Sequence, residues 1–66
     1  MVRVNRRDHV EWRAGMTVQD VLDAMGYDYA LLSVFVNGTH VDREDFATHP
    51  VPDDAEFEAV HLAHGG

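Results

Sequence analysis

The chain has 66 residues, no cysteine and a formal net charge of −7, from twelve acidic residues against five arginines. This length supports one domain with a small core, and the missing cysteines exclude disulfides, a thiolate nucleophile and a cysteine zinc site. The acidic balance disfavours nucleic acid and anionic membranes as partners, so we expect protein partners with a basic face.

The N-terminal segment has the alternating pattern of a β-hairpin. Its apolar residues are separated by polar ones, as in half-buried strands. These apolar residues are Val2, Val4, Val10 and Trp12. Residues 5–8, Asn-Arg-Arg-Asp, lie between the two groups and predict a turn.

An amphipathic helix is expected next. Four apolar residues follow the i, i+3, i+4, i+7 spacing of one helical face: Val18, Val21, Leu22 and Met25. The polar residues between them would face water: Gln19, Asp20 and Asp23. Thr17 is a suitable N-cap, Asp20 suits the positive end of the helix dipole, and Gly26 predicts the C-terminal end.

The second half of the chain predicts another hairpin and a last strand. Residues 32–37 are rich in β-branched and aromatic side chains, and Asn37-Gly38 is a strong turn signal before residues 39–41. Residues 42–46 predict one helical turn that places Phe46 on the core, and two prolines then break regular structure. Asp53-Asp54 predicts a turn before a strand over residues 56–62, in which Phe57, with or without Val60, carries the apolar contribution.

This order of elements predicts an α+β fold. Strands before and after a single helix favour a mixed sheet of about five strands, covered on one face by that helix. We expect one domain over residues 1–66.

The chain ends in Gly65-Gly66, which chance gives in about one chain in 200. Glycines lack Cβ atoms, so such an end can thread a narrow channel in a partner and bring its carboxylate to an active site. ATP could then convert the carboxylate to an acyl-adenylate, which a sulfur or amine nucleophile attacks. The alternative is a frayed or cloning-derived tail, and in either case we expect it to be flexible.

No other pattern predicts catalysis. His61 and His64 are the closest histidine pair, but residues three apart on a strand point to opposite faces, so we expect no metal site. Turn chemistry explains the acidic clusters at residues 42–45 and 53–54 better than paired catalytic carboxylates do. We expect no catalytic residue and no bound cofactor.

Phe35 is out of phase with Val34 and Val36, so it should lie on the sheet face that the helix leaves open. It is either part of a protein-binding patch or an isolated surface residue, and the sequence leaves both interpretations open. Tyr27 and Tyr29 have no clear place in the pattern.

Several segments together resemble the ThiS group of sulfur carriers, which belongs to the ubiquitin-like β-grasp superfamily with the MoaD subunit of molybdopterin synthase. The resemblance rests on residues 14–22, on residues 34–41 with Arg43 and Phe46, and on the acidic turn, last strand and Gly65-Gly66. The chain departs from the family at Asp42, where proline is frequent, and at His61 and His64, where apolar residues are common.

The resemblance implies a carrier that other enzymes act on. Gly66 would be adenylated by an E1-like adenylyltransferase of the ThiF or MoeB type, which uses ATP, and then converted to a thiocarboxylate. Sulfur would pass to a thiazole synthase of the ThiG type, for the thiazole ring of thiamine. Gly65, His64 and Ala63 would insert into the active site of the partner enzyme. Leu62 and Phe35 would contact the partner outside that active site.

Three hypotheses remain open. The first is a sulfur carrier, not an enzyme, for thiazole or alternatively for molybdopterin or another sulfur-containing metabolite. The second is a ubiquitin-like protein modifier; the absence of lysine excludes only self-conjugation. The third is a passive interaction module. We expect the free chain to be monomeric. We also expect a cytoplasmic location, because no stretch approaches the roughly 20 apolar residues of a membrane span and the N-terminus lacks a signal core.

Overall fold

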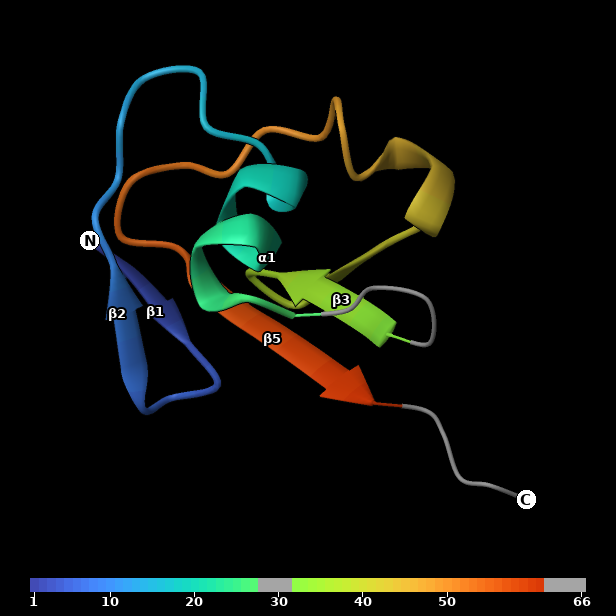
Figure 1. The fold of residues 1–66 in the computed structure, drawn as a ribbon, viewed down its shortest axis with the longest axis horizontal. Helices are drawn as coiled ribbons and strands as arrows, with labels where there is room; N and C mark the ends of the chain where they lie inside the picture. The colour runs from blue at the N-terminus through green and yellow to red at the C-terminus, as the bar shows by residue number, and fades with distance from the viewer. Residues whose placement is uncertain (28–31, 62–66) are drawn as a thin grey trace.

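A five-stranded mixed sheet with one helix across it forms the body of the protein (Figure 1). The computed structural model describes residues 1–27 and 32–61. The strand order is β2-β1-β5-β3-β4, in which β1 and β5 are parallel and the other neighbours antiparallel. The elements are β1 (Val2–Val4), β2 (Asp8–Val10), α1 (Val18–Met25), β3 (Leu32–Val36), β4 (Thr39–Val41), the 3₁₀ turn η2 (Arg43–Asp45) and β5 (Glu56–His61).

The first hairpin is present, but one of its predicted residues is not in a strand. β1 and β2 pair with Val2 opposite Val10, and Val2 is fully buried. Trp12 lies beyond the end of β2, where its indole N–H donates to the carbonyl oxygen of Val51 at 2.7 Å. A half-buried indole needs a partner for its one donor, and that carbonyl supplies it. The prediction of Trp12 as a strand residue was therefore wrong.

The helix has the predicted limits and both predicted caps. The backbone amide of Asp20 donates to the Thr17 hydroxyl at 3.4 Å, and the Thr17 amide donates to the Asp20 carboxylate at 2.9 Å. These two contacts form a capping box, which satisfies amides that the first turn leaves without a helical partner. At the other end Gly26 has φ +72°, a left-handed conformation that glycine adopts without strain.

The last strand is the middle strand of the sheet. It pairs with β1 on one side and with β3 on the other, with Val36 opposite Phe57 and Leu32 opposite His61. The structure describes it to His61, and Leu62 lies outside the described residues. Of the two apolar residues considered for this strand, Phe57 is fully buried, whereas the side chain of Val60 is 50% exposed. Ala59 is buried in its place because alternate residues of β5 face the helix.

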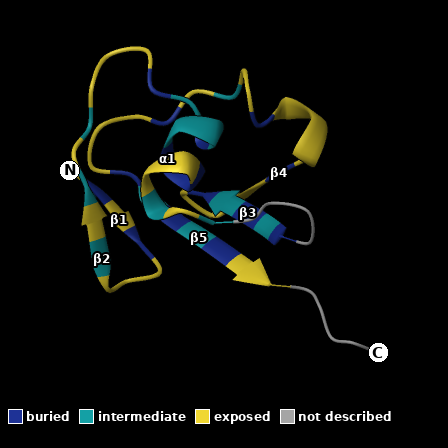
Figure 2. Ribbon diagram, in the orientation of Figure 1, coloured by how far each residue is buried: buried dark blue, intermediate teal, exposed yellow. Residues whose placement is uncertain are grey.

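The core lies between α1 and the sheet (Figure 2). Phe57 is fully buried, and Phe46, directly after η2, is 3% exposed as predicted. The remaining buried apolar residues come from every strand except β2, from α1 and from the loops: Val2, Val4, Met16, Val18, Val21, Leu22, Leu32, Val34, Val36, Val41, Val51, Ala55 and Ala59. In the described part of the chain, no helix has the length and apolar character needed to cross a membrane.

Candidate functional site

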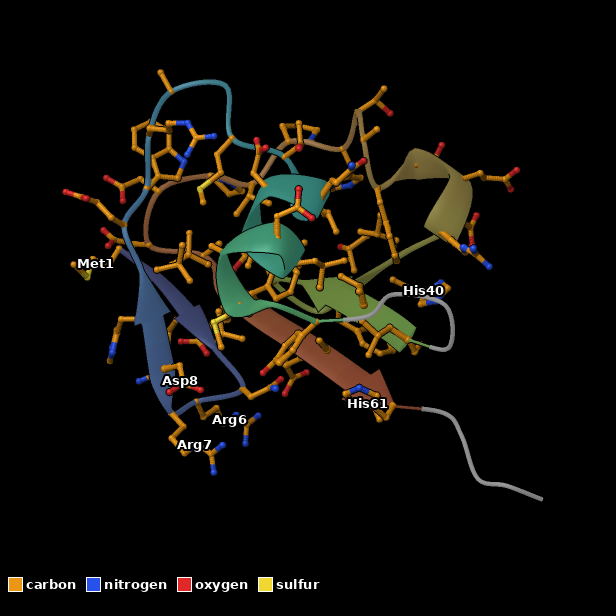
Figure 3. The ribbon with its side chains drawn as sticks, viewed as in Figure 1. Met1, Arg6, Arg7, Asp8, His40 and His61 are labelled. Carbon is orange, nitrogen blue, oxygen red and sulfur yellow. The ribbon has the colours of Figure 1, made fainter. Side chains whose placement is uncertain are left out.

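The candidate site begins where β5 ends, because this strand leads to the terminal glycines. Figure 3 places His61 at the end of β5, and Figure 1 shows this end projecting beyond α1. The predicted tail residues lie outside the described part of the chain: Leu62, Ala63, His64, Gly65 and Gly66. What the structure defines is therefore the anchor of this segment.

The end of β5 has a neighbouring strand on one side only. β1 stops at Val4, which is opposite Phe57, whereas β3 accompanies β5 as far as His61. Figure 2 shows the same change in burial, from buried and intermediate residues to exposed ones at the end of β5. The last part of β5 thus needs another partner on its β1 side.

Asn5 is that partner. Its backbone amide donates to the carbonyl oxygen of Phe57 at 2.8 Å, and its side-chain oxygen accepts from the amide of Ala59, also at 2.8 Å. The side chain takes the place that the next backbone carbonyl of β1 would occupy if the strand continued. The chain instead turns here, with φ of +53° at Asn5, a left-handed conformation that asparagine tolerates better than most residues.

Tyr27 reaches the same place from the C-terminal end of the helix. Its ring meets the ring of His61 edge to face, with centroids 6.0 Å apart and an interplanar angle of 74°. The side-chain nitrogen of Asn5 lies 3.5 Å from the Tyr27 hydroxyl oxygen and donates to it. Asn5, Tyr27 and His61 therefore form one group, which we call the strand-end cluster. No local sequence pattern indicated this cluster, because its members come from three distant segments.

The sheet face opposite the helix, which we call the open face, carries the predicted aromatic. Phe35 is half-buried there, and the His40 ring packs against it with centroids 5.3 Å apart. Exposed Val60 belongs to the same face because it alternates with buried Phe57 and Ala59 along β5. Phe35 is thus on the predicted face, where the side chain of His40 covers part of its ring.

Two ion pairs border this apolar part of the open face. Arg3 contacts Glu56 at 2.6 Å, and Arg6 contacts Glu58 at 3.8 Å. Glu58 is directly opposite Phe35 in the ladder between β3 and β5. These four charged residues line a surface hollow together with Asn37 and Gly38. The open face therefore combines a small apolar centre with a charged border, an arrangement found at protein interfaces.

The histidines and acidic clusters are the remaining candidates for metal binding or catalysis. Within the described ranges, no group of three or more histidine and acidic side chains is placed to hold a metal ion. Asp53 and Asp54 lie in an exposed turn, where Asp54 has φ +60°. Asp42 lies 3.6 Å from His40, at the exposed edge of the sheet.

A central last strand, a mixed sheet and a single helix across it define a ubiquitin-like β-grasp domain. The domain resembles the crystal structure of a thiamine biosynthesis protein (ThiS) from Geobacter metallireducens. The TM-score is 0.78 and the identity 27%, over 98% of this chain and 97% of that one. The ThiS family model matches residues 2–66, so the chain belongs to the ThiS family, as its motifs indicated. No curated protein sequence matches it.

Proposed function

We propose that the chain is a sulfur carrier for thiamine biosynthesis, and that Gly66 is the residue that carries sulfur. The observation that supports this most is the ThiS family match, which extends through residue 66 and so includes both terminal glycines. The similarity to the thiamine biosynthesis protein (ThiS) from Geobacter metallireducens points to the same pathway. In this role the chain is a substrate of other enzymes and not an enzyme itself.

The chemistry takes place on the terminal carboxyl group. A carboxylate oxygen of Gly66 attacks the α-phosphate of ATP, which forms an acyl-adenylate and releases pyrophosphate. Hydrosulfide (HS⁻) then attacks the acyl carbon and displaces AMP, which leaves a thiocarboxylate and releases a proton. Both glycines lack side chains, so they suit a narrow channel in the activating enzyme.

Membership of the ThiS family implies two partners. An E1-like adenylyltransferase of the ThiF type would bind ATP and activate Gly66, and a thiazole synthase of the ThiG type would accept the sulfur. The preceding residues, Ala63, His64 and Gly65, would lie inside the partner's active site, with Leu62 at its entrance. On the open face, Phe35 and Val60 offer apolar area and the adjacent charges offer orientation.

Deletion of Gly66 tests the proposal in cells. In a bacterial strain that lacks its own ThiS-type carrier, we expect the full chain, expressed with its E1-like enzyme, to restore growth without thiamine. The chain without Gly66 should give no growth, because the acceptor carboxylate is then one residue short of the active site. The truncated protein must keep its fold, which an NMR amide spectrum of residues 1–61 checks. Growth with the truncated chain would contradict the proposal.

A further inference from the structure

The strand-end cluster lies at the one place where the structure must control the tail. Residues 62–66 follow His61 directly, so the position of the end of β5 sets where any reaction at Gly66 can take place. A strand end that opens part of the time spreads the attached segment over a larger volume. It therefore lowers the fraction of molecules with the carboxylate in a reactive position.

Asn5 supplies the contact that would otherwise be missing. In an antiparallel ladder alternate residues direct their amides away from the partner strand, and the Ala59 amide points to the β1 side of β5. β1 has already ended there, and among residues 1–27 and 32–61 it is the Asn5 side chain that occupies this position. Ala59 is 7% exposed, which leaves water little access as a substitute.

Tyr27 adds a second support on the helix side of the sheet. His61 alternates with Phe57 and Ala59 and so faces the helix side, where the Tyr27 ring meets it. The hydrogen bond from Asn5 to the Tyr27 hydroxyl joins the two supports. Asn5 therefore holds the end of β5 within the plane of the sheet, and Tyr27 contacts it from the side of the sheet that faces the helix.

We propose that Asn5, supported by Tyr27, is a positioning residue for the activation of Gly66: it holds the last residues of β5 in one position, to which residues 62–66 are attached. This role rests on the proposed function. Loss of this role should lower kcat with little change in KM, because Asn5 is not among the residues of the open face that would dock on the enzyme.

The chain contains a matched control. Asn37 also has a left-handed backbone, with φ of +50°, and its side-chain oxygen accepts from the amide of Glu56 at 2.8 Å. It therefore makes the same kind of contact with β5 at the opposite end of the strand. Asn5→Gly and Asn37→Gly both keep the backbone conformation and each remove one such contact, so we expect similar losses of stability.

The first measurement is amide hydrogen exchange, which needs no partner. We expect Asn5→Gly to accelerate exchange at Ala59 by about tenfold, because one hydrogen bond of ordinary strength is lost. Asn37→Gly should leave Ala59 unchanged. Asn5→Asp keeps a side-chain oxygen as acceptor and should restore most of the protection. Unchanged exchange at Ala59 in Asn5→Gly would overturn the structural part of the proposal.

The second measurement is ATP–pyrophosphate exchange with the E1-like adenylyltransferase of the same organism. We expect Asn5→Gly to lower kcat by about threefold to tenfold with little change in KM, and Asn5→Asp to recover. Asn37 lines the hollow on the open face, so we expect Asn37→Gly to change KM and not kcat, and the two glycine variants are compared through kcat alone. An equal loss of kcat in Asn5→Gly and Asn37→Gly, or no loss in either, would overturn the positioning role. Failure of the wild-type chain itself would instead contradict the proposed function, and the positioning role with it.

Discussion

Two asparagines hold β5, one near each end of the strand. Asn5 binds the Ala59 amide and Asn37 binds the Glu56 amide, both through side-chain oxygens at 2.8 Å. Both residues also make tight turns with positive φ. One side chain therefore serves a local turn and a distant strand at the same time, which explains why an ordinary turn residue such as serine would be a poor replacement at either position.

Replacement of Gly26 by alanine has an effect on the free energy of unfolding that can be estimated. Its φ of +72° is unfavourable for any residue with a Cβ atom, although no atom would clash with one. We expect Gly26→Ala to lower the free energy of unfolding by about 1 kcal/mol, because the cost comes from the backbone alone. Urea denaturation measures it.

Gly26→Asn is the matched control for this prediction. Asparagine tolerates the left-handed conformation, so the loss should be smaller than with alanine. If asparagine and alanine destabilise equally, the cost does not come from the backbone conformation and the explanation is wrong.

At the start of the helix, the capping box makes stability depend on pH. The backbone amide of Thr17 donates to the Asp20 carboxylate and lowers the pKa of Asp20 below its usual value, and Arg13, at 3.6 Å, acts in the same direction. A lowered folded-state pKa means that the ionised form stabilises the fold. This stabilisation is complete above the unfolded pKa of about 3.9 and is lost as the pH falls through the folded value.

The prediction is that wild type loses more stability on acidification than Asp20→Asn does. Asparagine keeps an acceptor oxygen but no titrating group, so its contribution at this site stays constant with pH. Urea midpoints at pH 7 and near pH 3 provide the comparison, and at pH 7 wild type should be the more stable. An identical pH dependence of the two proteins would show that Asp20 does not contribute through its charge.

The helix could be predicted because all its determinants are local. Thr17, the apolar spacing and Gly26 lie within ten residues of one another and fix both ends. Val60 lies three residues after Phe57, and residues three apart on a strand point to opposite faces, so the alternation already indicated that Val60 faces away from the core. Trp12 was misjudged because its partner, the carbonyl of Val51, is 39 residues away.

For the molecule as a whole, the sequence indicated the fold class and proposed Gly66 as the reactive end, but it did not indicate the contacts that hold the end of β5. The order of strands and helix was sufficient for the α+β prediction, and the resemblance to the ThiS group implied the β-grasp fold. The parallel pairing of β1 with β5 depends on contacts between the two ends of the chain. The roles of Asn5 and Tyr27 follow from that pairing, so no local pattern could indicate them.

The charges of the whole molecule also bear on partner choice. The contacts of Arg3 with Glu56 and of Arg6 with Glu58 are between exposed side chains, and such pairs contribute only about 0–1 kcal/mol to stability. Their main effect is to shape the electrostatic potential of the open face. With a net charge of −7, the molecule as a whole favours a partner surface that is basic.

The most direct test of sulfur attachment at Gly66 is the intact mass of the purified chain. The mass is measured after incubation with the E1-like enzyme, ATP and a sulfur donor. We expect a mass gain that corresponds to the exchange of one oxygen for sulfur, located at Gly66 by fragmentation and absent when ATP is omitted. An unchanged mass, with an enzyme that activates another ThiS-family carrier under the same conditions, would contradict the proposed function.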